Sequence, residues 1–274
     1  MQSASEHPTP ELLTEAIQRA IEENSLAVLA TLVAAPRSVG AKLLLEEAGA
    51  QTGSLSDAAL DEAVARQAPA FIASRAEAAV HGVEDFAPEL EAWRSARILF
   101  ERIEPEPRLV ICGAGHVGAS LARLASLTGY RTLLIDDRAD FVVRERFPDQ
   151  NIELRAAENW TSALQKAVGK GRGVSVAIVT RGHNEDEECL RAVLTARPDY
   201  VGLIGSKRRT NIVLARLRET GMDESDLREV RAPIGLDIGA VSPEEVALAI
   251  LAEIVAARRG GTGAPLSAWR RDEG

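Results

Sequence analysis

The sequence lacks the features that mark membrane, secreted and nucleic-acid-binding proteins. No apolar run in its 274 residues approaches the length of a membrane span. Two cysteines, Cys112 and Cys189, are too few for a disulfide framework, and the first residues show no basic region followed by an apolar core. The formal charge of −9 opposes nucleic-acid binding, which requires a basic face. We therefore expect a cytoplasmic protein that binds neither nucleic acid nor membrane.

The chain is long enough for two domains, and its composition indicates where they meet. The segment ERIEPEP at 101–107 is charged and interrupted by two prolines, which is typical of a domain boundary. We therefore predict a smaller α+β domain over residues 1–104 and a second domain over residues 105–274.

The first domain is predicted to mix helices with strands. A helix begins at Pro10 with Thr9 as its cap, and an alanine-rich helix over 57–80 is broken at Pro69. Strands are predicted at 26–34, 42–45 and 96–103, with a turn at 49–53.

The second domain shows the alternation of apolar strands and helices that favours an α/β fold. The predicted strands are 109–111, 131–135, 151–154, 174–180 and 200–204. The predicted helices are 117–128, 160–168, 186–196 with Asn184 as cap, 207–220, and a last one that opens with a capping box at Ser242. This order predicts a Rossmann-like, doubly wound parallel sheet.

A glycine-rich turn between the first strand and helix of this domain predicts a nucleotide-type site. Gly113, Gly115 and Gly118 have the G-x-G-x-x-G spacing, which allows a diphosphate to approach the start of the helix. Asp136 and Asp137 end the next strand, where an acidic residue would hold a ribose. These residues alone also fit an oxidoreductase that uses NAD(P).

Polar residues also follow each of the other long strands of the domain. Because parallel strands bring their carboxyl ends to the same edge of the sheet, we expect these residues to lie together. We therefore predict a cofactor-binding edge that adds the following residues to the glycine turn and the two aspartates: His116, Arg181, His183, Gly205, Ser206, Lys207, Arg208 and Asp237.

The basic run Lys207–Arg209 opens a predicted helix, where the helix dipole disfavours positive charge. A bound anion would compensate this cost, and simple solvation of one or two of the three side chains is the alternative. His116 and His183 either contact the ligand or bond to loop carbonyls. With Asp186 they lack a further clear ligand, so we assign no metal site. The two cysteines fit core packing, and we assign no catalytic residue.

These motifs together resemble the XdhC/CoxI family, the accessory proteins of xanthine dehydrogenase and related molybdenum hydroxylases. The resemblance rests on GAGHVG at 113–118, DDR at 136–138, ERFP at 145–148, TRGHNED at 180–186, YVGLIGSKRR at 200–209 and APIGLDIGAVSPEEVALAILAEI at 232–254. It is fainter in VLATLV at 28–33 and PRSVGAKLLL at 36–45.

The resemblance implies a maturation factor more than a catalyst. It implies that the chain binds molybdenum cofactor (molybdopterin), protects it during sulfuration by a cysteine desulfurase, and delivers it to an apo molybdenum hydroxylase. We also expect a homodimer. Molybdopterin carries a phosphate or a dinucleotide, which suits the predicted edge.

The chain departs from this family in its first domain. Family members usually carry a Gly-Ser…Gly-Gly-Cys stretch there and often a second Cys-Gly-Gly segment, whereas residues 53–59 and 81–96 of this chain contain no cysteine. Two alternatives to a cofactor chaperone therefore stay open, an NAD(P)-dependent oxidoreductase and a nucleotide-sensing or scaffold protein.

Overall fold

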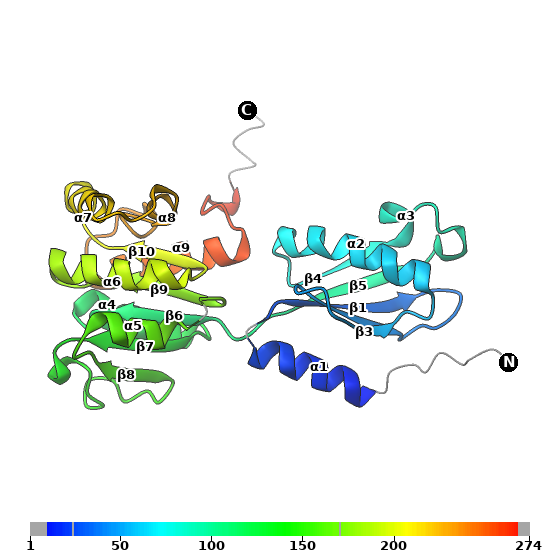
Figure 1. The fold of residues 1–274 in the computed structure, drawn as a ribbon, viewed down its shortest axis with the longest axis horizontal. Helices are drawn as coiled ribbons and strands as arrows, with labels where there is room; N and C mark the ends of the chain where they lie inside the picture. The colour runs from blue at the N-terminus through cyan, green and yellow to red at the C-terminus, as the bar shows by residue number, and fades with distance from the viewer. Residues whose placement is uncertain (1–9, 24, 170, 268–274) are drawn as a thin grey trace. The chain divides into compact units, whose positions relative to one another are not determined.

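A computed structural model describes residues 10–23, 25–169 and 171–267, so the predicted cap Thr9 lies outside the described residues. The chain divides between Pro105 and Glu106 into two compact units, called unit 1 and unit 2 below (Figure 1). None of the described helices combines the length and the apolar character that a membrane span requires.

Unit 1 is built on an antiparallel sheet with the strand order β3-β2-β1-β5-β4. The strands are β1 (Ala27–Ala34), β2 (Lys42–Glu46), β3 (Gln51–Ser54), β4 (Ala78–Gly82) and β5 (Arg97–Ile103). The long strands β1 and β5 pair at the centre. This arrangement agrees with the predicted α+β character of the first half.

Two helices cover opposite faces of that sheet (Figure 1). Helix α1 (Pro10–Glu22) buries Ala16 and Ala20 against Leu29 and Leu44. Helix α2 (Ala58–Ser74) buries one apolar face, including Phe71, in the larger core on the other side. The short helices α3 (Val83–Phe86) and η1 (Glu91–Trp93) lead into β5.

Unit 2 contains a parallel sheet with the strand order β10-β9-β6-β7-β8. The strands are β6 (Arg108–Cys112), β7 (Arg131–Asp136), β8 (Ile152–Ala156), β9 (Val174–Ile178) and β10 (Tyr200–Leu203). The chain runs outward from β6 to β8 and then crosses back to β9. The predicted Rossmann-like sheet is confirmed, and its switch point lies between β6 and β9.

Helices cover both faces of this sheet. Helices α4 (His116–Leu127) and α9 (Pro243–Arg259) pack on one face. Helices α5 (Trp160–Val168), α6 (His183–Ala196), α7 (Lys207–Glu219) and α8 (Glu224–Glu229) contribute to the core on the other face. The capping box at the start of α9 is present, with Ser242 and Glu245 each bonding the other's backbone N–H.

The predicted helix over 57–80 is wrong in two respects. Helix α2 continues through Pro69, and residues 78–82 form strand β4. Pro69 is exposed, and the helix persists because residues before and after it, such as Val64 and Phe71, are buried against the sheet. Strand β4 escaped prediction because it is an edge strand, half-exposed and alanine-rich.

Three smaller predictions also need correction. The predicted turn at 49–53 is shorter, because Gln51–Ser54 pairs with β2 as strand β3. Helix α6 begins at His183 with Gly182 as its N-cap, so Asn184 lies inside the first turn and is not the cap. Helix α8 was not predicted, because its polar sequence has no apolar repeat.

Candidate ligand-binding edge

The candidate site lies where the strands of unit 2 end. The turn after β6 stands at the switch point between β6 and β9, where open α/β sheets bind their ligands. The segment after residue 230 runs beside β10 in the parallel direction, because Leu203 bonds to both Arg231 and Ile234. The Ile234–Gly239 loop therefore emerges at the same edge of the sheet as the carboxyl ends of β6, β7, β9 and β10.

Two of the three motif glycines are required by the chain itself. Gly113 has a φ of +112°, and a Cβ there would lie 2.6 Å from the carbonyl oxygen of Val179. A Cβ on Gly118 would overlap the carbonyl oxygen of Gly113. Both glycines allow α4 to start directly against the sheet.

Gly115 is different, because nothing in the described chain requires glycine there. Its φ is −68°, which other residues adopt readily, and a Cβ would have no atom within 4 Å. The open space at Gly115 faces away from the chain, at the start of α4. Backbone N–H groups at that helix end have no side-chain cap, so they are free to bind an anion.

Asp136 lies at the predicted position, but its carboxylate is turned inward. It is 1% exposed and accepts hydrogen bonds from Ala114 N at 2.6 Å and from Arg138 Nε at 2.8 Å. Burial raises the pKa of Asp136, but the bonds from Arg138 and Ala114 outweigh burial and hold that pKa below its usual value. Asp136 therefore fixes the glycine turn, whereas the neighbouring Asp137 is half-exposed.

Two arginines that the prediction did not include surround this turn. Arg138 stacks on the ring of Phe141 with 3.5 Å between the guanidinium carbon and the ring centroid. Arg146 donates to the carbonyl oxygens of Phe141 at 2.8 Å and of Ala114 at 3.3 Å. Arg138 belongs to the motif DDR and Arg146 to the motif ERFP. Their place in these motifs is the sequence feature that could have identified them as site residues.

A buried polar cluster connects the loops after β9 and β10. Asp186 is fully buried and accepts from Thr180 Oγ1 at 2.6 Å and from Arg209 Nε at 2.9 Å. Burial raises the pKa of Asp186, and the bonds from Thr180 and Arg209, with the charge of His183, offset only part of that rise. Arg209, the last residue of the basic run Lys207–Arg209, is therefore paired with a buried carboxylate.

The other predicted residues of these loops are exposed or paired at the surface. Arg181 forms ion pairs with Asp137 at 2.8 Å and with Glu185 at 3.5 Å, which joins the loops after β7 and β9. The side chains of the following residues are exposed: His116, His183, Lys207, Arg208 and Asp237.

The start of α7 presents positive charge without internal compensation. Ser206 caps the helix by accepting from Arg209 N, and Gly205 before it has a φ of +150°. Lys207 and Arg208 form no ion pair with another described residue. Two cations at a helix N-terminus are unfavourable in the free protein, so this end of the edge suits an anion.

The last loop is held from α9. Glu253 accepts hydrogen bonds from Gly235 N at 2.6 Å and from the Tyr200 hydroxyl at 2.8 Å. Asp237 stands beyond this anchor and is exposed. Among the described residues, no three His, Cys, Asp or Glu side chains lie together as metal ligands would.

Comparisons with known families agree with the division of the chain. Residues 109–254 match the model of the XdhC Rossmann domain, and residues 20–82 match that of the XdhC and CoxI family.

Three curated relatives match more than half of the chain. YqeB of Escherichia coli is 34% identical over 157 residues, which are 57% of this chain and 28% of that protein. A probable xanthine dehydrogenase subunit of Bacillus subtilis is 29% identical over 61% of this chain and 47% of its own length. The molybdenum cofactor insertion chaperone PaoD of Escherichia coli is 27% identical over 56% of this chain and 41% of its own length. The aligned part of this chain spans less than half of each relative.

Among solved structures, one described as a xanthine dehydrogenase from Bacillus halodurans covers 93% of this chain and 98% of its own. Its TM-score is 0.49 at 19% identity.

Proposed function

This chain belongs to the XdhC and CoxI family, and on that premise we propose that it binds molybdenum cofactor as cargo at the carboxyl edge of unit 2. The name of PaoD, a molybdenum cofactor insertion chaperone, and that of the Bacillus subtilis xanthine dehydrogenase subunit support a role in cofactor maturation. The role is that of a carrier, with no chemical step assigned to a residue of this chain.

The observation that carries the proposal is the open space at Gly115. Glycine is needed there only if another molecule approaches the backbone at the start of α4. A phosphate of the cofactor would accept from the first N–H groups of that helix, with Gly113 and Gly118 shaping the turn. Lys207 and Arg208 would contact the same anionic ligand, since they form no ion pair within the described part of the chain and begin a helix at this edge.

The remaining predicted residues would serve as contacts or supports. His116 and His183 are exposed at the starts of α4 and α6, where their ring nitrogens can bond to a pterin or a phosphate. Asp237 is exposed in the last loop. Asp136, Asp137 and Arg181 hold the loops in place, because their charged groups already pair with other residues.

The proposal extends to partners. We expect a cysteine desulfurase to sulfurate the carried cofactor, and an apo hydroxylase of the xanthine dehydrogenase type to receive it. This chain offers no accessible thiol for a sulfur relay, because Cys112 and Cys189, its two cysteines, are both fully buried. The desulfurase must then deliver sulfur directly to the cargo. A cytoplasmic homodimer is part of the same proposal.

The test is to purify the protein from a host that makes molybdopterin and to measure bound pterin by the fluorescence of its oxidised form. We expect pterin to copurify with the wild type and to be absent from Gly115→Val, whose side chain would fill the ligand's space. The proposal fails if the wild type carries no pterin and does not affect maturation of a molybdenum hydroxylase.

The alternative function, an NAD(P)-dependent oxidoreductase, rests on the glycine turn and Asp136. The inward bonds of Asp136 weigh against it, since the carboxylate would have to leave Ala114 and Arg138 to hold a ribose. Titration with NADH and NADPH separates the two functions, because micromolar affinity for either nucleotide would favour the alternative.

A further inference from the structure

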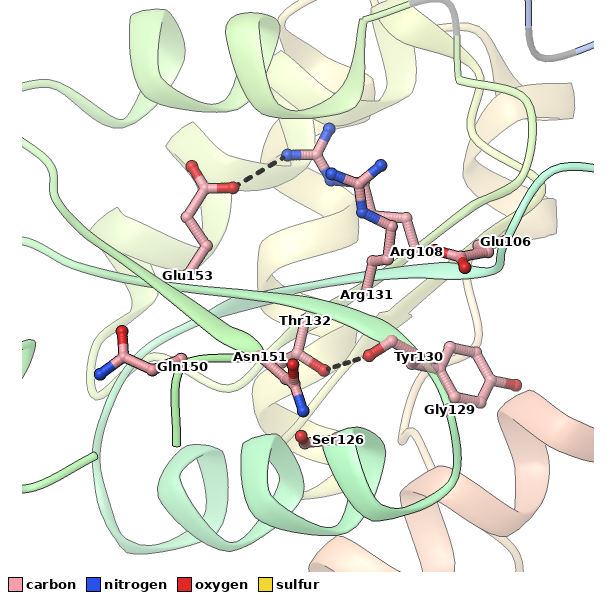
Figure 2. Close-up of a pocket in the computed structure, with 10 residues that line it drawn as sticks. All are labelled: Glu106, Arg108, Ser126, Gly129, Tyr130, Arg131, Thr132, Gln150, Asn151 and Glu153. Carbon is pink, nitrogen blue, oxygen red and sulfur yellow. Dashed lines mark hydrogen bonds and ion pairs between the residues drawn. The ribbon is translucent and has the colours of Figure 1, made fainter. Parts of the chain in front are cut away.

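Unit 2 has a recess at the sheet edge opposite the glycine turn. It has a volume of about 420 Å³ and is lined by the first residues of β6 and β7, by β8, and by the end of α4 (Figure 2). The residues that matter below are Arg108, Ser126, Arg131, Thr132, Asn151 and Glu153. No residue of the candidate cofactor site lines it, so it is a separate feature of the unit.

Two arginines face this recess from neighbouring strands. Arg108 and Arg131 are register partners in the parallel pair β6–β7, so their side chains leave the same face of the sheet. Figure 2 shows the two guanidinium groups side by side, with Glu153 of β8 across from them. Like charges directly opposite one another destabilise a sheet, so this pair has no structural benefit by itself.

The two arginines are incompletely paired with the carboxylates around them. The Glu153 carboxylate is divided between Arg155 Nη2 at 2.6 Å and Arg108 Nη2 at 3.7 Å. Arg131 forms no ion pair with another described residue. The other carboxylate that lines the recess, that of Glu106, is exposed and likewise has no ion pair within the described chain. Two arginines and two glutamates therefore line the recess, and the glutamate that pairs with Arg108 is shared with Arg155, which lies outside the lining.

The surroundings of Arg108 agree with this incomplete pairing. Burial lowers the pKa of Arg108, and the neighbouring charges of Arg131 and Arg155 lower it further, against the opposite effect of Glu153. Arg155 also keeps its Nη1 atom buried without a hydrogen-bond partner in the described part of the chain. An incoming anion would relieve the repulsion among these groups.

The other side of the recess carries hydroxyl and amide groups. The Ser126 hydroxyl donates to the Asp149 carboxylate, and its oxygen can still accept a hydrogen bond. The Thr132 hydroxyl is buried and donates to the Tyr130 carbonyl, and its side chain leaves the opposite face of the sheet from Arg131. The side-chain amide of Asn151 adds donors and an acceptor. The recess thus reaches around the end of the sheet from the two arginines to Ser126 and Asn151, which suits a small ligand with one anionic group and a hydrogen-bonding group.

We propose that this recess is a binding site for a small polar metabolite whose phosphate or carboxylate is held by Arg108 and Arg131. The planar guanidinium groups suit bidentate binding to either oxyanion. A concave recess of this size favours a small molecule over a peptide segment. The site is independent of the proposed cofactor edge, because it lies at the opposite end of the strands.

Isothermal titration of the full chain at low ionic strength tests the proposal. The probes are ribose 5-phosphate, inorganic phosphate and citrate, which separate a sugar phosphate, the bare anion and a carboxylate. We expect saturable binding of at least one probe and a loss of about tenfold or more in affinity for Arg131→Gln. Arg131→Lys keeps the charge but not the planar fork, so its loss should be smaller.

Matched controls make the outcome decisive. Arg97→Gln removes an exposed arginine at the first position of another strand, β5, and should leave the affinity unchanged. Lys207→Gln with Arg208→Gln removes the cations of the proposed cofactor edge, so any probe binding that this change abolishes belongs to that edge and not to the recess. The proposal is overturned if no probe binds saturably, if Arg131→Gln binds as the wild type does, or if the Lys207 and Arg208 changes remove the binding. Binding of a glutamate-rich peptide with no binding of the three probes would equally overturn it.

Discussion

The carboxylate of Asp186 accepts two hydrogen bonds from the side chain of Arg209, at 2.9 Å from Nε and 2.5 Å from Nη2. Asp186 is in the first turn of α6 and Arg209 is in the first turn of α7, so this pair joins the starts of two helices at the candidate site. Thr180, at the end of the β9 segment, completes the cluster.

Arg209→Met should destabilise unit 2, because it leaves a buried carboxylate with Thr180 as its remaining side-chain donor. We expect a loss of about 3 kcal/mol in the free energy of unfolding, measured with urea at neutral pH. The loss should shrink in acid, since a buried carboxyl with a raised pKa costs least when it is protonated. Arg208→Met, an exposed neighbour, should change stability by less than about 0.5 kcal/mol. An equal loss at neutral and acidic pH would contradict this interpretation.

The motif glycines should separate folding from binding. Gly115→Ala should keep the melting temperature within a few degrees of the wild type, because its methyl group meets no atom, but it should lose copurified pterin. Gly118→Ala should destabilise the fold, because its methyl group would overlap the Gly113 carbonyl. Melting curves and pterin fluorescence on the same samples check both. Full pterin content in Gly115→Ala would remove the main support for the proposed site.

Charge reversal at the start of α7 should trade ligand affinity for stability. Lys207→Glu with Arg208→Glu should weaken an anionic ligand and make little difference to an uncharged one. The same change places negative charge at a helix N-terminus, which should stabilise α7 by about 0.3–1 kcal/mol per residue at low salt. Lys166→Glu with Arg228→Glu is the charge-matched control on other helices. Equal affinity for the anion in both double variants would argue against this helix start as an anion site.

The glycine turn should weaken in acid because Asp136 holds it. A carboxyl with a depressed pKa in the folded state contributes stability above its unfolded pKa, about 3.9, and loses it as the pH falls through the folded value. Unfolding midpoints measured from pH 7 to pH 2.5 should therefore fall less steeply below about pH 4 in Asp136→Asn than in the wild type. Parallel curves would show that Asp136 does not contribute.

The two cysteines should not react in the folded protein. Burial raises the pKa of Cys189 well above its usual value, and Cys112 is equally inaccessible at the end of β6. A thiol reagent should label neither cysteine until the protein is unfolded. Cys112→Ala with Cys189→Ala should still copurify with pterin, provided that it folds. Loss of pterin from a folded double variant would assign the thiols a role in cargo handling.

Local patterns were sufficient to predict most of unit 2. The strand at 174–178 is a continuous apolar run, and the Ser242 capping box gives the start of α9 directly. Prediction failed where tertiary contacts override local preference. Pro69 stays within a helix because its neighbours are buried, and the bond between Asp186 and Arg209 joins two helices that no local pattern brings together.

In the candidate site, too, local patterns predict the positions of residues but not their tertiary contacts. The position of Asp136 is evident from the spacing after the glycine turn, but its orientation depends on Ala114 and Arg138. Arg138 and Arg146 could not be assigned from periodicity, because their contacts form between segments that are distant in sequence or irregular. The recess with Arg108 and Arg131 depends on strand register, which no local pattern specifies.

The order of the strands has a consequence for when the protein can capture a ligand. Strand β6 pairs with β9 only after β7, β8 and α5 have been synthesised, and the Ile234–Gly239 loop is anchored by Glu253 near the end of α9. Such pairings between distant segments are slow to form. The proposed edge would therefore be complete only once unit 2 has been synthesised and folded, so a partly made chain would not bind the proposed ligand there.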